Sequence, residues 1–201
     1  CWTIKTSQMK PATVIIFTIF SFCILAFRQA SNSSDFKTKT ETFLQKYSVN
    51  YSLITETLDA SGFQWQLDNN TKHSWTKKQT IKGKKSFINK YNQRSYQRLF
   101  LAFYQYDSEK NCNLALDSLT KNFPVECCLD LKVGENVRSL RTIPSIYIFN
   151  KTEIITCHIH CEQLQDNWTS IQQDLINIFG NEQSTIMTTG CGGPLEWKRK
   201  N

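Results

Sequence analysis

The residues best suited to chemistry are the cysteines and histidines in the second half of the chain. The segment from Cys157 to Cys161 reads Cys-His-Ile-His-Cys, and both residue types bind zinc in proteins. If residues 153–161 form an extended strand, the two cysteines lie on one face and the two histidines on the other. The cysteine Cα atoms are then about 13 Å apart, at ~3.3 Å per residue. This spacing argues against one metal site shared by these residues. No motif in the sequence requires a cofactor.

Cysteines also carry the main structural expectation. Beyond the first 30 residues there are six: Cys112, Cys127, Cys128, Cys157, Cys161 and Cys191. An even number in an oxidising compartment predicts up to three disulfides, with fifteen possible pairings. Cys157 and Cys161 cannot bond to each other on one strand, because the Cα atoms of a disulfide lie within about 7 Å. Each needs a distant partner, for which Cys127 or Cys128 on a neighbouring strand is the first choice, and one disulfide is expected to hold the tail through Cys191.

Positive charge gathers in one segment. The chain has a formal net charge of +7, yet residues 72–98 hold nine Lys or Arg and no acid. Aromatic residues are interleaved there, so the segment is a candidate for binding sulfated glycan or an anionic membrane surface, and no nucleic acid is expected. The alternative is the solvated face of a helix. The candidate polyanion-binding residues are Lys82, Lys84, Lys85, Lys90 and Arg94.

The first 30 residues have the layout of a signal peptide. Lys5 and Lys10 precede an uncharged stretch, Ala12 to Phe27, which is followed by Arg28 and polar residues. We therefore expect a secreted protein or one of the endoplasmic reticulum lumen. The apolar stretch is a little short of the ~20 residues that span a bilayer, so an uncleaved signal anchor in the membrane is the alternative. Five glycosylation sequons agree with a secretory glycoprotein and begin at Asn32, Asn50, Asn69, Asn150 and Asn167.

Hydrophobic periodicity predicts the elements that position these residues. An amphipathic helix is expected over residues 36–48, a strand over 63–67 and a basic helix over 82–97. Residues 99–104, 113–123 and 125–131 predict a strand, a helix and a strand that form a right-handed βαβ unit. Strands 146–149 and 153–160 should pair as a hairpin, and apolar residues from Leu164 to Ile178 predict a helix that ends at Gly180.

This order of elements resembles the thioredoxin fold. The segment Arg141-Thr-Ile-Pro-Ser-Ile-Tyr-Ile-Phe is similar to that family's loop-and-strand signature, and the resemblance covers about residues 99–179. It implies an α/β fold with a thioredoxin-like mixed sheet flanked by helices, here disulfide-stapled and preceded by a hydrophobic leader. It also implies a cis bond before Pro144, which would face the active-site helix. The expected parts are a leader (1–30), a polar extension with a helix and a strand (31–80), the thioredoxin-like domain (81–180) and a tail (181–201).

The resemblance fails at the catalytic motif. Thioredoxin-like oxidoreductases place C-x-x-C where the first strand enters its helix, and this chain has only Cys112 there. We therefore expect a protein that acts by binding another protein. Two alternatives stay open: a single-thiol oxidoreductase or peroxidase that uses Cys112 beside Pro144, and a disulfide-rich secreted ligand or effector. For Cys112 itself, the structural interpretation is one half of a disulfide.

Overall fold

The structure, a computed structural model, describes residues 34–54, 67, 73–121, 131–138 and 142–200. Residues 39–201 make up one compact unit. Residues 1–38 make up another, of which only residues 34–38, the start of a helix over residues 34–48, are described. None of the helices in the described part of the chain is long and apolar enough to cross a membrane.

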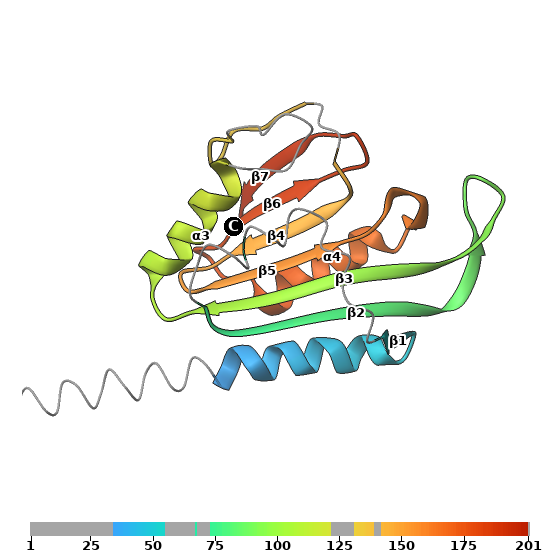
Figure 1. Ribbon diagram of the computed structural model, residues 1–201, viewed down its shortest axis with the longest axis horizontal. Coiled ribbons are helices and arrows are strands. Elements are labelled where there is room, and N and C mark those ends of the chain that lie inside the picture. The colour runs from blue at the N-terminus through green and yellow to red at the C-terminus, as the bar shows by residue number, and fades with distance from the viewer. Residues whose placement is uncertain (1–33, 55–66, 68–72, 122–130, 139–141, 201) are drawn as a thin grey trace, which may run out of the picture. The chain divides into compact units, whose positions relative to one another are not determined.

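Seven strands of the described residues form one sheet, in the order β1-β2-β3-β5-β4-β6-β7 (Figure 1). Every neighbouring pair of these strands is antiparallel. The strands are β1 (Tyr51–Ile54), β2 (His73–Ile88), β3 (Arg94–Tyr106), β4 (Ser145–Phe149), β5 (Glu153–His158), β6 (Thr185–Thr189) and β7 (Leu195–Arg199).

Helices cover both faces of β3. We call the helix over residues 34–48 the first helix. On one face Phe103 contacts Phe43 of this helix and Phe179 of α4 (Trp168–Phe179), with ring centroids 6.4 and 5.4 Å apart. Such aromatic pairs contribute about 0.5–1.5 kcal/mol each beyond the area that they bury. On the other face α3 (Glu109–Lys121) buries Cys112 and Leu119 in a core shared with alternate residues of β3. The alternation of side chains along one strand therefore builds two separate cores.

The basic helix predicted over residues 82–97 is wrong. These residues form the distal part of the β2–β3 hairpin, in which Ile88 pairs with Arg94 and Ser86 with Tyr96. Helical spacing of Phe87, Ile88 and Tyr91 was a short signal, and the backbone hydrogen bonds of an antiparallel ladder with β3 override it.

The predicted βαβ unit is also wrong in its strand pairing. Both edges of β3 are occupied along residues 100–105, by β2 on one side and β5 on the other, and both ladders are antiparallel. A parallel strand therefore has no place beside the predicted strand 99–104. Residues 125–130 of the second strand lie outside the described residues, as does most of the predicted strand 63–67.

The later elements follow the periodicity more closely. The β4–β5 hairpin is confirmed with its turn at residues 150–152. The predicted terminal helix is confirmed as α4, although Leu164 lies before it, exposed at the end of a short 3-10 helix (Cys161–Gln163). Residues 181–201, expected to be a tail outside the domain, are part of the sheet, because β6 and β7 complete it. Since one sheet runs from β1 to β7, the expected boundaries at residues 80/81 and 180/181 do not separate structural parts.

Candidate functional site

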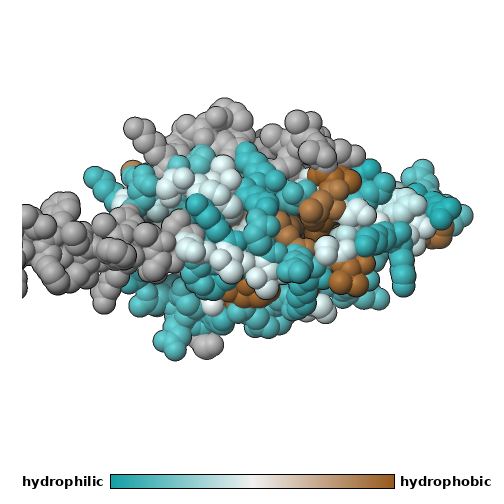
Figure 2. Space-filling model, turned by 90° about the horizontal axis from the view of Figure 1, so that it is seen from below, coloured by the Kyte–Doolittle hydropathy of each residue, from teal (hydrophilic) through white to brown (hydrophobic). Residues whose placement is uncertain are grey.

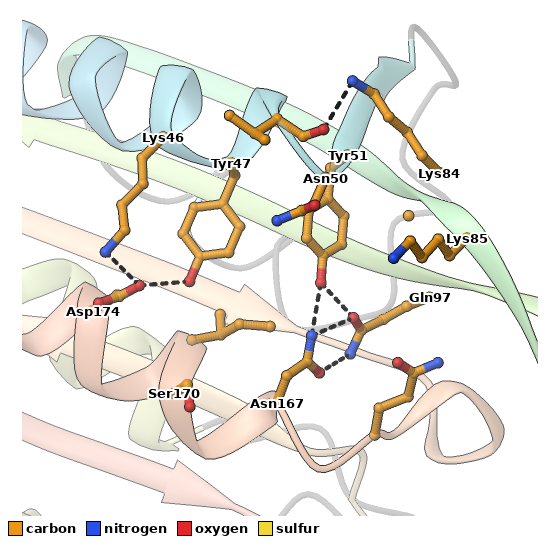
Figure 3. Close-up of a pocket in the computed structure, with 14 residues that line it drawn as sticks. Lys46, Tyr47, Asn50, Tyr51, Lys84, Lys85, Gln97, Asn167, Ser170 and Asp174 are labelled. Carbon is orange, nitrogen blue, oxygen red and sulfur yellow. Dashed lines mark hydrogen bonds and ion pairs between the residues drawn. The ribbon is translucent and has the colours of Figure 1, made fainter.

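A polar cleft of about 490 Å³ lies on the face of the sheet that carries α4. Its walls are the end of the first helix, β1, the Gly83–Lys85 segment of β2 and the first two turns of α4 (Figure 3). The Gly83–Lys85 segment is a bulge: Lys82 pairs with Arg98 and Ser86 with Tyr96, so three residues of β2 stand opposite Gln97 alone. The bulge turns these three residues toward the first helix and opens the cleft.

The floor of the cleft is a closed group of neutral hydrogen bonds, which we call the amide triad (Tyr51, Gln97 and Asn167). The Gln97 amide donates to Asn167 Oδ1 at 2.8 Å, and the Asn167 amide donates to Tyr51 Oη at 3.0 Å and to Gln97 Oε1 at 3.1 Å. The Tyr51 hydroxyl donates to Gln97 Oε1. Burial raises the pKa of Tyr51, so its hydroxyl stays protonated. These bonds hold β1, β3 and the start of α4 in a fixed arrangement.

A second polar group lies farther along α4. Asp174 accepts a hydrogen bond from the Tyr47 hydroxyl at 2.9 Å and forms an ion pair with Lys46 at 2.8 Å. Slight burial raises the pKa of Asp174. Hydrogen bonds from Lys46 and Tyr47 outweigh this effect and hold the pKa below its usual value. Burial, and then the hydrogen bond to Asp174, raise the pKa of Tyr47. The carboxylate is thus committed to its two partners and is not a free general base.

The two lysines of the bulge have different roles. Lys84 donates to the carbonyl oxygens of Ser48 and Val49 at 2.8 and 3.1 Å, where a cation stabilises the carboxyl end of the first helix. Lys85 forms no hydrogen bond or ion pair within the described residues, and Figure 3 shows its ammonium group directed toward Tyr51 and Gln97. Its positive charge therefore faces the cleft.

The cleft offers hydrogen-bonding groups to a ligand. Three further polar side chains line it without a side-chain hydrogen bond in the described part of the chain: Asn50, Gln165 and Ser170. With Lys85 they offer donors and acceptors to a ligand, beside the rings of Tyr47 and Tyr51. Among the described residues, no cysteine or histidine lines the cleft. The arrangement can bind a polar, anionic molecule, and it presents no activated nucleophile.

The expected pair of Cys112 and Pro144 is not formed. The Cys112 sulfur lies 3.5 Å from the carbonyl oxygen of Asn150, at the turn end of the β4–β5 hairpin. Pro144 precedes Ser145 at the opposite end of β4, about 20 Å from Asn150 at ~3.3 Å per residue. The described residues contain no cis peptide bond, so the cis bond expected before Pro144 is also wrong.

Cys112 is a buried free thiol and not the expected half of a disulfide. Burial, followed by the charges of Glu153 and Glu109, raises its pKa to about 12. A thiolate is the reactive form, so this cysteine is unreactive at neutral pH. The geometry therefore gives no support to chemistry at Cys112.

The Cys157–Cys161 segment is divided between interior and surface. Cys157 is buried and free, and burial raises its pKa. His158 is buried against the ring of Phe100, with centroids 5.2 Å apart, and burial lowers its pKa to about 4. Among the residues that the structure describes, no three His, Cys, Asp or Glu side chains gather around a metal position.

One predicted disulfide is present. Cys161 bonds to Cys191 with a Cα separation of 5.6 Å, which confirms that a disulfide holds residues 181–201 through Cys191. The first choice of partner for Cys161 was therefore wrong. Cys127 and Cys128 lie outside the described residues.

The five basic candidates do not form one surface. Lys84 and Lys85 line the cleft, whereas Lys82 lies over the Tyr96 ring, 4.5 Å from its centroid. Lys90 and Arg94 lie at the end of the hairpin, beyond the cleft. The segment therefore supplies two separate sites, and each is considered below.

The sequons differ in what the fold allows. Asn150 donates both amide hydrogens, to Glu153 Oε2 and to the Phe179 carbonyl oxygen, and Asn167 donates both within the amide triad. A glycan replaces one amide hydrogen, so it would break a bond of the folded state at either position. Asn50 is exposed at the cleft mouth and has no such conflict. Asn32 and Asn69 lie outside the described residues.

Most cleft residues could not be recognised from the sequence. Tyr47, Tyr51, Gln97, Asn167 and Asp174 belong to four elements and share no motif. Lys84 and Lys85 were marked by the local excess of charge, and Asn50 and Asn167 were marked only as glycosylation sequons. A scan against family models, a search of curated proteins and a search of solved structures each find no match for this chain.

Proposed function

We propose that this chain is a binding protein whose cleft recognises a saccharide that carries a sulfate or carboxylate group. The observation that carries this proposal is the Lys85 ammonium group. It is directed into the cleft, has no hydrogen-bond or ion-pair partner among the described residues, and lies next to an amide triad that is already satisfied. An anionic substituent would pair with Lys85, and charge-assisted hydrogen bonds are the stronger ones.

The rest of the cleft agrees with a hydroxyl-rich ligand. Amide side chains such as Asn50 and Gln165 both donate and accept, as a sugar hydroxyl does. The tyrosine rings offer an apolar surface to the C–H groups of a sugar ring. A volume of about 490 Å³ is typical of small-molecule sites. The protein partner, the secretory location and the likeness to thioredoxin-like domains stay predictions, and this proposal depends on none of them.

Calorimetry with a sulfated disaccharide and its desulfated counterpart tests the proposal. The wild-type chain should bind the sulfated form, and Lys85→Gln should weaken that binding about tenfold, which corresponds to ~1.4 kcal/mol. Lys110→Gln removes an equal charge from the exposed face of α3 and should leave the affinity unchanged.

Lys85→Gln in the protein and removal of the sulfate from the sugar form a double-mutant cycle. If Lys85 pairs with the sulfate, Lys85→Gln should not alter the weaker binding of the desulfated sugar. Equal losses for the Lys85 and Lys110 variants, or no binding of either sugar by the wild type, would contradict the proposal.

A further inference from the structure

The end of the β2–β3 hairpin projects from the sheet as a separate feature. Among the described strands, residues 86–96, the hairpin tip, pair only with each other, because β1 reaches no farther than Gly83 and β5 begins its pairing at Phe100. Figure 1 shows this ribbon extending past the other strands. The tip lies at the outer end of the sheet, where a flat surface could meet it first.

The turn of the tip is held in one conformation. Asn89 Oδ1 accepts hydrogen bonds from the backbone N–H groups of Tyr91 and Gln93, at 3.0 and 2.9 Å. Asn92 has φ of 57°, a left-handed conformation that asparagine tolerates better than most residues. The tip therefore presents its side chains without a large loss of conformational entropy on binding.

Two large apolar side chains are exposed at this end. Ile88 is 63% exposed and Tyr91 is 62% exposed. Single exposed apolar residues are ordinary, but here two lie on one rigid turn at an extremity. Figure 2 shows a small hydrophobic group at the same end of the molecule, surrounded by hydrophilic surface.

Positive charge accompanies these side chains. Lys90 lies 5.0 Å from the Tyr91 ring centroid, and Arg94 is the cross-strand partner of Ile88. Neither Lys90 nor Arg94 forms an ion pair within the described part of the chain. A partner for this tip must therefore accept apolar side chains and cations together.

We infer that the hairpin tip docks onto an anionic lipid surface. Ile88 and Tyr91 would enter the interface between headgroups and acyl chains, where tyrosine is favoured, while Lys90 and Arg94 would contact anionic headgroups. A soluble sulfated glycan would use the cations equally well but would leave Ile88 in water. The exposed isoleucine thus decides between these two polyanions.

Co-sedimentation of the whole protein with phosphatidylcholine vesicles, with and without phosphatidylserine, tests the inference. Binding should require phosphatidylserine and weaken as salt is added. The double variant Ile88→Ser/Tyr91→Ser should bind at least about tenfold more weakly. Each of Lys90→Gln and Arg94→Gln should weaken binding about fivefold.

Two controls separate docking from loss of fold. Leu114→Ser removes a side chain of similar exposure from α3 and should bind vesicles as the wild type does. Asn89→Ala keeps every apolar and charged group of the tip but loosens its turn, so it should give an intermediate loss. Circular dichroism of each variant should match the wild type.

The contrary outcomes are specific. Vesicle binding that survives Ile88→Ser/Tyr91→Ser but falls with Lys90→Gln, together with displacement by heparin, would show a general polyanion surface and overturn the inference. Equal binding to vesicles with and without phosphatidylserine would do the same.

Discussion

The polar cleft and the interior of the sheet contrast in the kind of residue that they hold. The interior contains the groups with intrinsic reactivity, Cys112, Cys157 and His158, and all three are buried. Burial moves their pKa values away from the reactive or charged forms. The cleft is open to solvent but is lined mainly by neutral amides, hydroxyls and a free ammonium group.

This contrast shows that residue type alone is a poor guide to the site. Cysteine and histidine attract attention in a sequence because they can act as nucleophiles, bases and ligands, yet here they serve packing. The residues that can meet a ligand are common ones, such as Asn50 and Gln165. Exposure and unsatisfied hydrogen-bonding capacity distinguish the two regions, and both are properties of the folded chain.

The largest effect should come from removing the disulfide beside the cleft. Cys161→Ala/Cys191→Ala opens a cross-link over 30 residues, and chain entropy predicts a loss of about 3–4 kcal/mol in the free energy of unfolding. Because Cys161 begins the short segment that leads to Gln165 and Asn167, saccharide binding should weaken as well. Urea denaturation and calorimetry measure both. Cys157→Ala, which breaks no cross-link, is the control for stability, and an equal loss there would contradict this account.

Acid should destabilise the interior of the sheet around His158. His158 has a pKa of about 4 in the folded chain and about 6.5 in the unfolded chain, so the unfolded state binds the proton first. The stability that neutral His158 contributes is present above about pH 6.5 and is lost as the pH falls toward 4. The expected loss is about 3 kcal/mol.

Urea denaturation at several pH values measures this loss. His158→Phe, which keeps an aromatic ring beside Phe100, should flatten the dependence between pH 6.5 and 4. Gln183→Leu, which changes a non-titrating residue at an exposed turn, should not flatten it. The same slope in the His158 variant as in the wild type would place the titration elsewhere.

A smaller effect is expected from Gln97→Leu at the floor of the cleft. The change leaves the Tyr51 hydroxyl and the Asn167 amide without their partner, and each unsatisfied group costs about 1–3 kcal/mol when fully buried. Water in the open cleft should satisfy part of this loss, so about 1–2 kcal/mol of unfolding free energy should remain. Gln183→Leu at an exposed turn should change stability by less than about 0.5 kcal/mol. A neutral Gln97→Leu in both unfolding and saccharide binding would show that the amide triad is not structural.

Local patterns foretold the elements that depend on nearby residues. The alternation and turn of residues 146–160 sufficed for the β4–β5 hairpin, and the four-three spacing of apolar residues sufficed for α4. The segment 82–97 failed because its apolar residues fit either period over so short a length, and its partner strand decided the outcome. The tail failed for a related reason, since β6 and β7 become strands only by pairing with β4 and with each other.

By itself, the sequence determined the charge distribution, the hairpin and helix of the second half and the presence of a disulfide at the tail, because spacing and composition along the chain are enough to specify them. Only the tertiary structure decided which polar groups meet a ligand. The bulge opposite Gln97, the start of α4 and the end of the first helix come from distant parts of the chain, and they form a cleft because an antiparallel sheet and its helices bring them together. The same packing buried the thiols and the imidazole, and burial removed the chemistry that their residue types suggested.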